Sequence, residues 1–417
     1  MTYSRLNNLL STFNFVMIFV GFLFATSLFL PANTLNDSLV RSVTIPYRAA
    51  MLALAISVVL LNLRQRDKSQ YSLSFFAFLL FWVILIIRIL YDTTLREDIS
   101  LGDTSLTWVY IVGICMPTIL SLAVSYRVID VEKAFWWILI LAGFTFAIII
   151  LKNNALFTLD AAIQGRHQGN AAVSTISFGH FGATSIILAL YALFNRKTTF
   201  FSKLMLVFIV LVGFFFVVRA GSRGPIVALV FVFLFLNFGR IKNLFVAFVI
   251  LGLTILVLSF AVDSVFSAVG NISPLLEARL RVTIEGVGFG SRDIYYSSAV
   301  DLFLESPVWG SQYLIVFDDG SSDYSHNIFL DALMANGIFG FLLLLYFLSI
   351  GLMKSNYLLK NKHSEAWLGL LLVQQVSFNM FSGAFYLNPM LSALLVIILL
   401  KHKASRHLVP QQKAPNH

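Results

Sequence analysis

The stretch that decides the fold is residues 71–91, YSLSFFAFLLFWVILIIRILY. It carries a single charged side chain, Arg88, and its length matches the ~20 apolar residues that an α-helix needs to cross a bilayer. Eleven similar apolar runs lie at 12–31, 46–63, 106–126, 134–151, 173–194, 204–218, 225–238, 244–262, 333–353, 366–383 and 389–400. The pattern predicts an all-α polytopic membrane protein with about 12 transmembrane helices.

The composition of the 417 residues leads to the same class of protein. Hydrophobic types make up 59% of the chain and charged types 12%, whereas soluble domains are roughly 45–50% apolar and about 25% charged. This balance excludes a soluble enzyme, a disordered protein and a disulfide scaffold. Cys115 is the single cysteine, which excludes an intrachain disulfide and a cysteine-based metal site.

The net charge of +9 is first a topology signal in a membrane protein. With the N-terminus inside, 18 of the 29 Lys and Arg residues fall on inner connections and 10 on outer ones. This bias predicts that both termini are cytoplasmic. The chain then divides into nine helices in 1–262, one long outer loop with short helices such as 292–305 in 263–325, three helices in 326–403 and a cytoplasmic tail in 404–417.

The outer cations are concentrated in three connections, 152–172, 219–224 and 263–325. These hold seven of the ten: Lys152, Arg166, Arg219, Arg223, Arg279, Arg281 and Arg292. Topology disfavours cations on the outer side. Because arginine suits bidentate phosphate recognition, these residues indicate a site for an anion.

The first candidate site is RAGSRGP at 219–225, between two apolar runs. Pro225 suits the first turn of a helix, so Arg223 would lie at a helix N-terminus, where free N–H groups and the helix dipole favour anions. Arg219 and Arg223 together form a candidate diphosphate site. The alternative is a tight hairpin whose arginines reach lipid headgroups.

The second candidate site is GSRDIYY at 290–296, followed by SPVWG at 306–310. Arg292 begins an amphipathic segment that suits a membrane surface, and it is a candidate for a further anion ligand. The alternative is a salt bridge from Arg292 to Asp293 or Asp301.

The third candidate site combines SHNIFL at 325–330 with GIFG at 337–340, where an acidic loop meets an apolar run. Imidazole titrates near neutral pH, so His326 suits proton abstraction from an attacking group. The alternative is a histidine at a helix start that bonds to backbone, with Asn327 as the cap. Three aspartates that would orient the ring are Asp318, Asp319 and Asp323.

The remaining polar residues give weaker signals. GRHQGN at 165–170 supplies Arg166, or is an ordinary polar loop. Arg88 precedes Asp92 by four residues, which favours an ion pair. Four polar residues within apolar runs line a cavity or, more commonly, form interhelical hydrogen bonds: His180, Gln374, Gln375 and Asn379. No spacing indicates a calcium or zinc site, so we expect no metal.

Taken in order along the chain, the motifs resemble the O-antigen ligase and O-antigen polymerase superfamily. The resemblance rests on SRGP at 222–225, GSR at 290–292 and SPVWG at 306–310, with SHNIFL and GIFG closing the loop. It covers about 165–345 in recognisable pieces. It implies a glycosyltransferase whose substrate is a glycan on undecaprenyl diphosphate at the periplasmic face of the bacterial inner membrane. It also implies inverting transfer without a metal or another cofactor.

The resemblance carries over to individual residues. Arg223 and Arg292 match the arginines that bind the diphosphate in the family. His326 matches its proposed general base. Arg219 and Arg166 match more loosely as further diphosphate ligands. Two supporting residues beside the base are Asn327 and Asp323.

Two activities occur in this family. A polymerase joins a growing chain to another lipid-linked repeat, and a ligase transfers the finished chain to the lipid A core. The run HNIFLD at 326–331, followed closely by GIFG, favours a polymerase. The ligase is the first alternative and a lipid-linked oligosaccharide flippase the second. Expected partners are the lipid-linked donor, an acceptor glycan or the lipid A core, membrane lipids and a chain-length regulator, with no nucleic acid.

Overall fold

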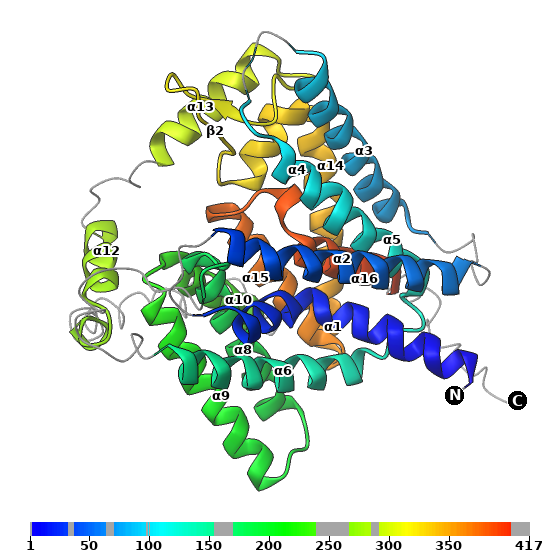
Figure 1. Ribbon diagram of the computed structural model, residues 1–417, viewed down its shortest axis with the longest axis vertical. Helices are drawn as coiled ribbons and strands as arrows, with labels where there is room; N and C mark the ends of the chain where they lie inside the picture. Colours follow the sequence, from blue (N-terminus) through cyan, green and yellow to red (C-terminus); the bar gives the residue numbers. More distant parts are fainter. Residues whose placement is uncertain are drawn as a thin grey trace, which may run out of the picture.

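The computed structural model describes residues 2–31, 37–63, 71–96, 99, 101–153, 170–238, 267–284 and 292–401. Within these ranges the protein is mostly helical (Figure 1). The helices long and apolar enough to cross a membrane are α1 (Tyr3–Phe29), α2 (Asp37–Asn62), α3 (Leu73–Thr94), the continuous α4–α5 segment (Ser105–Ser125), α6 (Val131–Lys152), α8 (Thr175–Asn195), α9 (Phe200–Arg219) and α14 (Ile328–Lys360).

Three shorter apolar helices complete the helical bundle: α10 (Arg223–Phe238), α15 (Ala366–Phe381) and α16 (Pro389–Lys401). Eleven of the twelve predicted apolar runs therefore coincide with helices, and the run at 244–262 lies outside the described residues. Within α4–α5, α4 (Ser105–Tyr110) and α5 (Met116–Ser125) are joined by a π-helical turn at Ile111–Cys115. The structure thus confirms a polytopic all-α membrane protein.

The surface of α3 shows why the chain belongs in a membrane. Its exposed side chains recur every three or four residues and are apolar: Leu73, Phe76, Leu80, Val83 and Ile87. Its opposite face is buried and packs against α14. A helix that is apolar on its exposed face as well as its buried face is stable in lipid and not in water.

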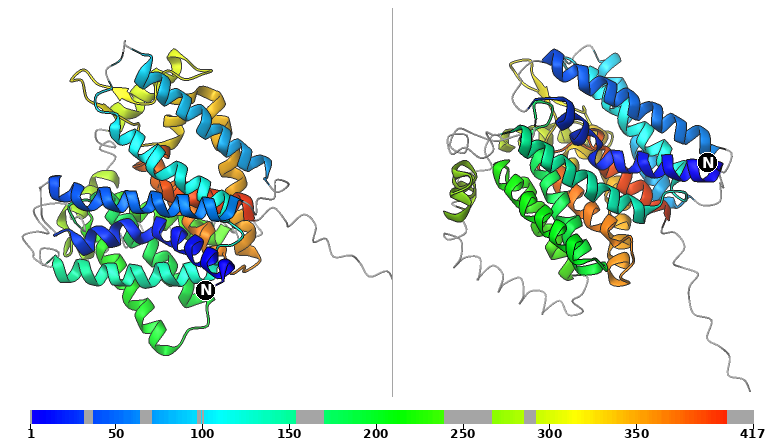
Figure 2. Two further views of the ribbon diagram at one scale, coloured as in Figure 1. Left: turned by 45° about the vertical axis from the view of Figure 1, so that its right-hand side comes forward. Right: turned by 60° about the horizontal axis from the view of Figure 1, so that its bottom comes forward.

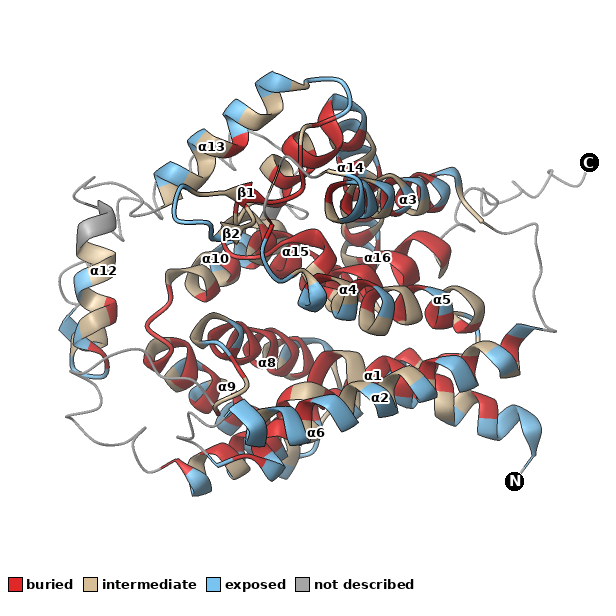
Figure 3. Cartoon of the chain, turned by 45° about the horizontal axis from the view of Figure 1, so that its top comes forward, coloured by how far each residue is buried: buried red, intermediate tan, exposed pale blue. Residues whose placement is uncertain are grey.

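The centre of the bundle is formed by α15 and α16. Figure 3 shows both coloured as buried along nearly their whole length. The helices that contact them include α1, α5, α8, α10 and α14. Figures 1 and 2 show α1, α2 and α6 side by side, with α3 and α14 at an angle to them.

The predicted loop at 263–325 contains short elements in its described part. These are α12 (Pro274–Ile284), α13 (Arg292–Glu305), β1 (Ile315–Val316) and β2 (Ser322–Asp323). The two strands pair in antiparallel fashion, with Ile315 opposite Asp323. The helix predicted at 292–305 is confirmed as α13.

We name the two ends of the bundle by the helices that begin or end there. The end where α9 and α15 finish and α10 and α14 begin is called the site end, because it contains the candidate site described below. The opposite end is where α1 and α6 begin. Lys152, one of the predicted outer cations, lies in the last turn of α6. Its Nζ donates to the carbonyls of Leu28 and Leu30 at the C-terminal end of α1 (2.6 and 3.4 Å). A structural role at a helix C-terminus therefore accounts for this lysine.

Two helices start well before the predicted runs. α2 begins at Asp37 instead of residue 46, because polar residues interrupt the apolar run in its first turns and Pro46 lies inside the helix. α14 begins at Ile328 instead of 333, because Asn327 caps it: the Asn327 Oδ1 accepts from the N–H groups of Phe329 and Leu330 (2.9 and 3.4 Å). Asn327 is thus the helix cap that the sequence suggested, and the role of His326 stays a prediction.

Candidate functional site

Residues of two sequence motifs, and the residue that precedes a third, meet around Ser382, which follows the last turn of α15. The Arg292 Nη2 donates to the Ser382 Oγ at 3.0 Å. The Tyr324 hydroxyl donates to the Ser382 carbonyl at 3.5 Å. Gly224, in the first turn of α10, lies beside the same hydroxyl group. The candidate site therefore combines α10, α13, the segment before α14 and the end of α15.

The turn between α9 and α10 is fixed by two arginines. Arg219 ends α9, is 3% exposed, and donates to the Ile272 carbonyl at 3.0 Å. Arg279 of α12 donates to the Gly221 carbonyl at 3.2 Å. Both bonds hold the α12 region against the turn, and the role of Arg219 as a diphosphate ligand stays a prediction.

Arg223 lies at the first residue of α10, and Pro225 falls in the same turn, as predicted. Its guanidinium lies within electrostatic range of those of Arg292 and Arg279. Three like charges from α10, α12 and α13 are thus gathered at one helix N-terminus. Such a group repels itself and is stabilised when an anion binds.

Arg292 opens α13, and its side chain turns towards α15. Its hydrogen bond to Ser382 replaces the salt bridge to Asp293 or Asp301 that was the alternative from sequence. The hydroxyl is a neutral acceptor, which orients the guanidinium without cancelling its charge. Arg292 is therefore held ready for an anionic ligand.

The backbone of His326 is held in place by hydrogen bonds of the residues directly before and after it. Before it, the Ser325 N–H and Oγ donate to the Asp331 Oδ1 at 2.9 and 2.6 Å. After it, Asn327 caps α14. Between these anchors His326 has a φ of 61°, a left-handed conformation that costs a non-glycine residue roughly 1–2 kcal/mol. Backbone held in such a conformation by its surroundings is common at functional sites.

The His326 ring lies among two tyrosines and one carboxylate. Its centroid is 4.4 Å from that of Tyr324 and 5.0 Å from that of Tyr295. The Nε2 is 3.5 Å from the Asp323 Oδ2. Of the three aspartates predicted to orient the ring, Asp323 is the one in contact. Asp319 instead accepts from the N–H and Oγ of Ser321 in the turn between the strands.

Tyr324 was not singled out from the sequence, yet it links the two halves of the site. Its ring contacts His326 and its hydroxyl reaches Ser382, the residue that Arg292 binds. Burial, assisted by the charges of Asp323 and Asp331, raises the pKa of the Tyr324 hydroxyl. The hydroxyl therefore stays protonated and can act as a hydrogen-bond donor.

The SPVWG and GIFG motifs interlock behind His326. α14 is broken at Gly337, where φ is 61°, and a Cβ there would lie 2.3 Å from the Val308 carbonyl oxygen. Gly310 has a φ of 81°, and its Cβ would lie 2.4 Å from the Ala335 carbonyl. Only glycine fits at either position. These motifs set the direction of the first turns of α14, which begins two residues after His326.

Arg88 clamps this interlocked segment to α3. Its guanidinium donates to the carbonyls of Trp309, Gly310, Ser311 and Ala335 at 2.8–3.1 Å. The predicted pairing with Asp92 is present at 3.5 Å, and the Asp92 Oδ2 accepts from the Tyr313 N–H at 2.8 Å. The sequence predicted the ion pair but not the clamp, because the four carbonyls lie more than two hundred residues away.

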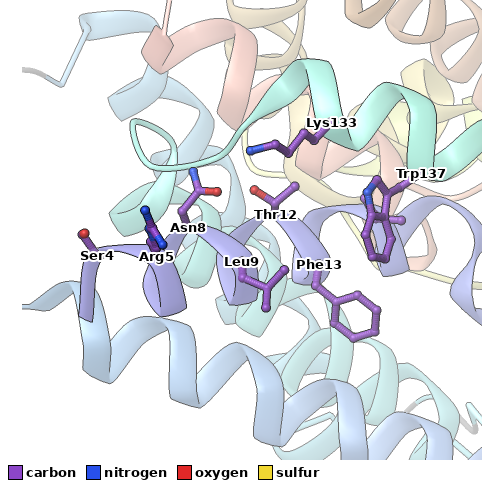
Figure 4. A pocket seen from close by; sticks show the side chains of 9 residues that line it. Ser4, Arg5, Asn8, Leu9, Thr12, Phe13, Lys133 and Trp137 are labelled. Carbon is purple, nitrogen blue, oxygen red and sulfur yellow. The ribbon is translucent and has the colours of Figure 1, made fainter. Parts of the chain in front are cut away.

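Some of the predicted residues lie in parts of the chain that the structure does not describe. Arg166 lies outside the described residues, as do Gly290 and Ser291 of the GSR motif. A groove of about 420 Å³ lies at the opposite end, between the first turns of α1 and α6, with Arg5, Phe13, Lys133 and Trp137 among its lining residues (Figure 4). It is separate from the candidate site.

The fold and this arrangement define a multi-pass helical membrane protein with an arginine and histidine site at one end of the bundle. Residues 207–345 match the family model for O-antigen ligase. The matched region runs from α9 to the middle of α14 and contains Arg219, Arg223, Arg292 and His326. The match confirms the resemblance to the O-antigen ligase and polymerase superfamily, whose members are glycosyl-transfer enzymes. No curated protein matches the chain.

Proposed function

We propose that this protein is a polysaccharide polymerase that joins undecaprenyl-diphosphate-linked glycan repeats at the periplasmic face of the inner membrane. The observation that carries the proposal is the convergence on Ser382 of three residues: Arg292 of α13, Gly224, which follows Arg223 in α10, and Tyr324, whose ring contacts His326. Cations that lie next to a base suit a reaction with an anionic leaving group and a hydroxyl nucleophile.

The proposed step is a single displacement at the anomeric carbon. The acceptor hydroxyl oxygen bonds to that carbon while the bond from carbon to the phosphate oxygen breaks, and the electron pair leaves with undecaprenyl diphosphate. His326 takes the hydroxyl proton. Arg223 and Arg292 stabilise the negative charge that grows on the diphosphate. The reaction inverts the configuration because attack and departure occur on opposite faces.

The surroundings of His326 fit the part of a base. The Asp323 Oδ2 lies 3.5 Å from the His326 Nε2 and faces the ring. Ser325, Asp331 and the Asn327 cap hold the backbone, so the ring is positioned before the acceptor binds. These contacts support roles for Asp323 and Asn327 beside the base.

Deletion of the gene tests the activity. Loss of a polymerase leaves lipid A core carrying at most one repeat, while other steps continue. Complementation with the wild-type gene should restore long chains, and complementation with His326→Ala should not, at equal protein levels. Long chains in the deletion strain would overturn the proposal.

The ligase is the second candidate, and the family model that matches residues 207–345 favours it because it describes O-antigen ligase. The same deletion distinguishes the two activities. Loss of a ligase leaves bare core, with long polymer retained on the lipid carrier. That result would replace the polymerase with the ligase while keeping the same roles for Arg223, Arg292 and His326.

A further inference from the structure

His180 is a buried polar side chain that the proposed step does not use. It lies in the second turn of α8 and is 4% exposed. Its carbonyl accepts from the Gln374 Nε2 and the Thr184 Oγ1 at 2.9 and 3.0 Å, so the backbone is tied to α15. Neither ring nitrogen has a hydrogen-bond partner within the described part of the chain. Interhelical bonding, the commoner role expected from sequence, therefore involves the backbone of His180 and not its ring.

The ring faces the first turn of α10 across a glycine. A Cβ on Gly224 would lie 3.2 Å from the His180 Nε2, 3.9 Å from the Ser222 Oγ and 4.0 Å from the Ser382 Oγ. Three buried polar groups from α8, the α9–α10 turn and the end of α15 thus surround the place where any other residue would put a methyl group. We name this place the Gly224 notch.

The notch adjoins the cations of the candidate site. The Ser382 Oγ on its border accepts from Arg292 at 3.0 Å, and Arg223 immediately precedes Gly224 at the N-terminus of α10. A helix N-terminus and two guanidinium groups favour a negatively charged atom at this position.

A buried imidazole without a hydrogen-bond partner destabilises a protein, because it has lost its contacts with water and gained none in return. An apolar side chain would pack against Phe378, whose ring centroid is 4.3 Å from that of His180, without this cost. The unpartnered ring of His180 therefore calls for an explanation other than packing.

We propose that the Gly224 notch binds a non-bridging phosphate oxygen of the lipid diphosphate, with the His180 Nε2–H donating to that oxygen. This inference rests on the proposed function and adds His180, Gly224 and Ser222 to the donor site. The diphosphate would then be held by arginine forks on one side and by a neutral imidazole on the other. The neutral donor fixes position without adding to the repulsion among the arginines.

The first test fills the notch with a methyl group. Gly224 lies in a helix and has no left-handed φ, so Gly224→Ala is compatible with the backbone and raises helix propensity. We expect the KM for the lipid-linked donor to rise at least tenfold, with the KM for the acceptor unchanged and the Tm equal or higher. The matched control is Gly143→Ala in α6, where a Cβ would meet only Ile209 at 3.8 Å; it should behave as wild type.

The second test changes the imidazole. His180→Leu removes the unpartnered polar group, so we expect the Tm to be retained or raised while binding of undecaprenyl diphosphate weakens at least tenfold in lipid nanodiscs. His180→Gln keeps a donor and should recover part of the affinity. Inorganic diphosphate as a competitor distinguishes the headgroup from the lipid: it should displace undecaprenyl diphosphate less well from both variants than from wild type.

Two results would overturn the inference. One is wild-type binding of undecaprenyl diphosphate by both Gly224→Ala and His180→Leu. The other is a loss of binding that tracks a fall in Tm, which would make His180 purely structural. Either result leaves the proposed function intact if Arg292→Ala still abolishes donor use. Normal transfer by Arg292→Ala and His326→Ala would instead overturn the proposed function itself.

Discussion

Cations at the two ends of the bundle include examples with different kinds of hydrogen-bond or ion-pair partner. At the opposite end Lys133, Arg196 and Lys401 pair with Asp130, Glu132 and Glu365 at N–O distances of 2.8, 2.6 and 2.5 Å, while Lys354 donates to the carbonyls of Ile398 and Leu399. At the site end Arg281 pairs with Glu277 at 2.9 Å and Arg88 with Asp92 at 3.5 Å, whereas Arg292 binds a neutral oxygen, the Ser382 Oγ.

This difference separates two uses of positive charge. A carboxylate partner cancels the field of a cation, and the pair serves topology and local packing. A hydroxyl or carbonyl partner fixes the direction of a guanidinium and leaves its field in place. Charge that is oriented but not cancelled can stabilise an anion that arrives later, without the cost of reorganising the site. Arg292 is the clearest example.

The largest effect is expected for His326→Ala. Removing a general base lowers transfer by about 10²–10⁴-fold, and the donor should still bind because the arginines remain. The measurement is the initial rate of glycan transfer from a lipid-linked repeat, with protein abundance checked in the same membranes. His363→Ala, at the opposite end between α14 and α15, is the matched control and should transfer normally. Activity within tenfold of wild type for His326→Ala would remove the base from the mechanism.

The next effect concerns the arginine with the neutral partner. Arg292→Ala should lower kcat/KM for the donor by about 10²–10³-fold, the range seen when one donor to a developing negative charge is removed. Arg292→Lys should recover only part, since lysine lacks the planar fork. Arg127→Ala, a cation stacked on Tyr126 away from the site, serves as control. An equal loss of kcat/KM in Arg292→Ala and Arg127→Ala would show that the effect does not depend on the position of the arginine at the site.

A smaller effect, on stability, is expected for the clamp. Arg88→Met leaves the carbonyls of Trp309, Gly310 and Ala335 without their charged donor, while the Ser311 carbonyl keeps Arg96 at 2.9 Å. We expect about 3 kcal/mol of destabilisation, since hydrogen bonds to charged groups contribute about 1.5–3 kcal/mol each. Thermal unfolding of the purified protein in detergent measures it. Lys133→Met removes a cation of the opposite end and should shift the Tm little. A wild-type Tm for Arg88→Met would contradict the clamp.

The helices were predictable because long apolar runs and caps are local properties of the sequence. The start of α13 at Arg292 and the first turn of α10 at Pro225 follow from such signals. The partners of Arg88 and Arg292 were not predictable, because they lie 221–247 and 90 residues away in the chain. These contacts depend on how helices pack, which the spacing of residues in one segment does not encode.

The residues that sequence reasoning missed share a reason. Ser382 and Tyr324 belong to no recognised motif, and serine and tyrosine are common in membrane helices and loops. His180 did carry a signal, as a histidine inside an apolar helix, but interhelical hydrogen bonding is the commoner role for such a residue. Only the three-dimensional contact with Gly224 shows what lies in front of its ring.

The smallest effect tests the opposite end of the comparison. Asp130 both pairs with Lys133 and caps α6 by accepting from the Lys133 N–H at 3.0 Å. Asp130→Asn keeps a side-chain oxygen for the cap and removes the charge, while Lys133→Met keeps the stem. The double-mutant cycle of these two changes therefore isolates the ionic part, which should be about 0.2–1 kcal/mol for an exposed pair and should decrease as salt is added. A salt-independent coupling energy above about 2 kcal/mol would mean that the Lys133–Asp130 pair is stronger than expected for an exposed ion pair. A carboxylate partner would then not be enough to mark a cation as structural.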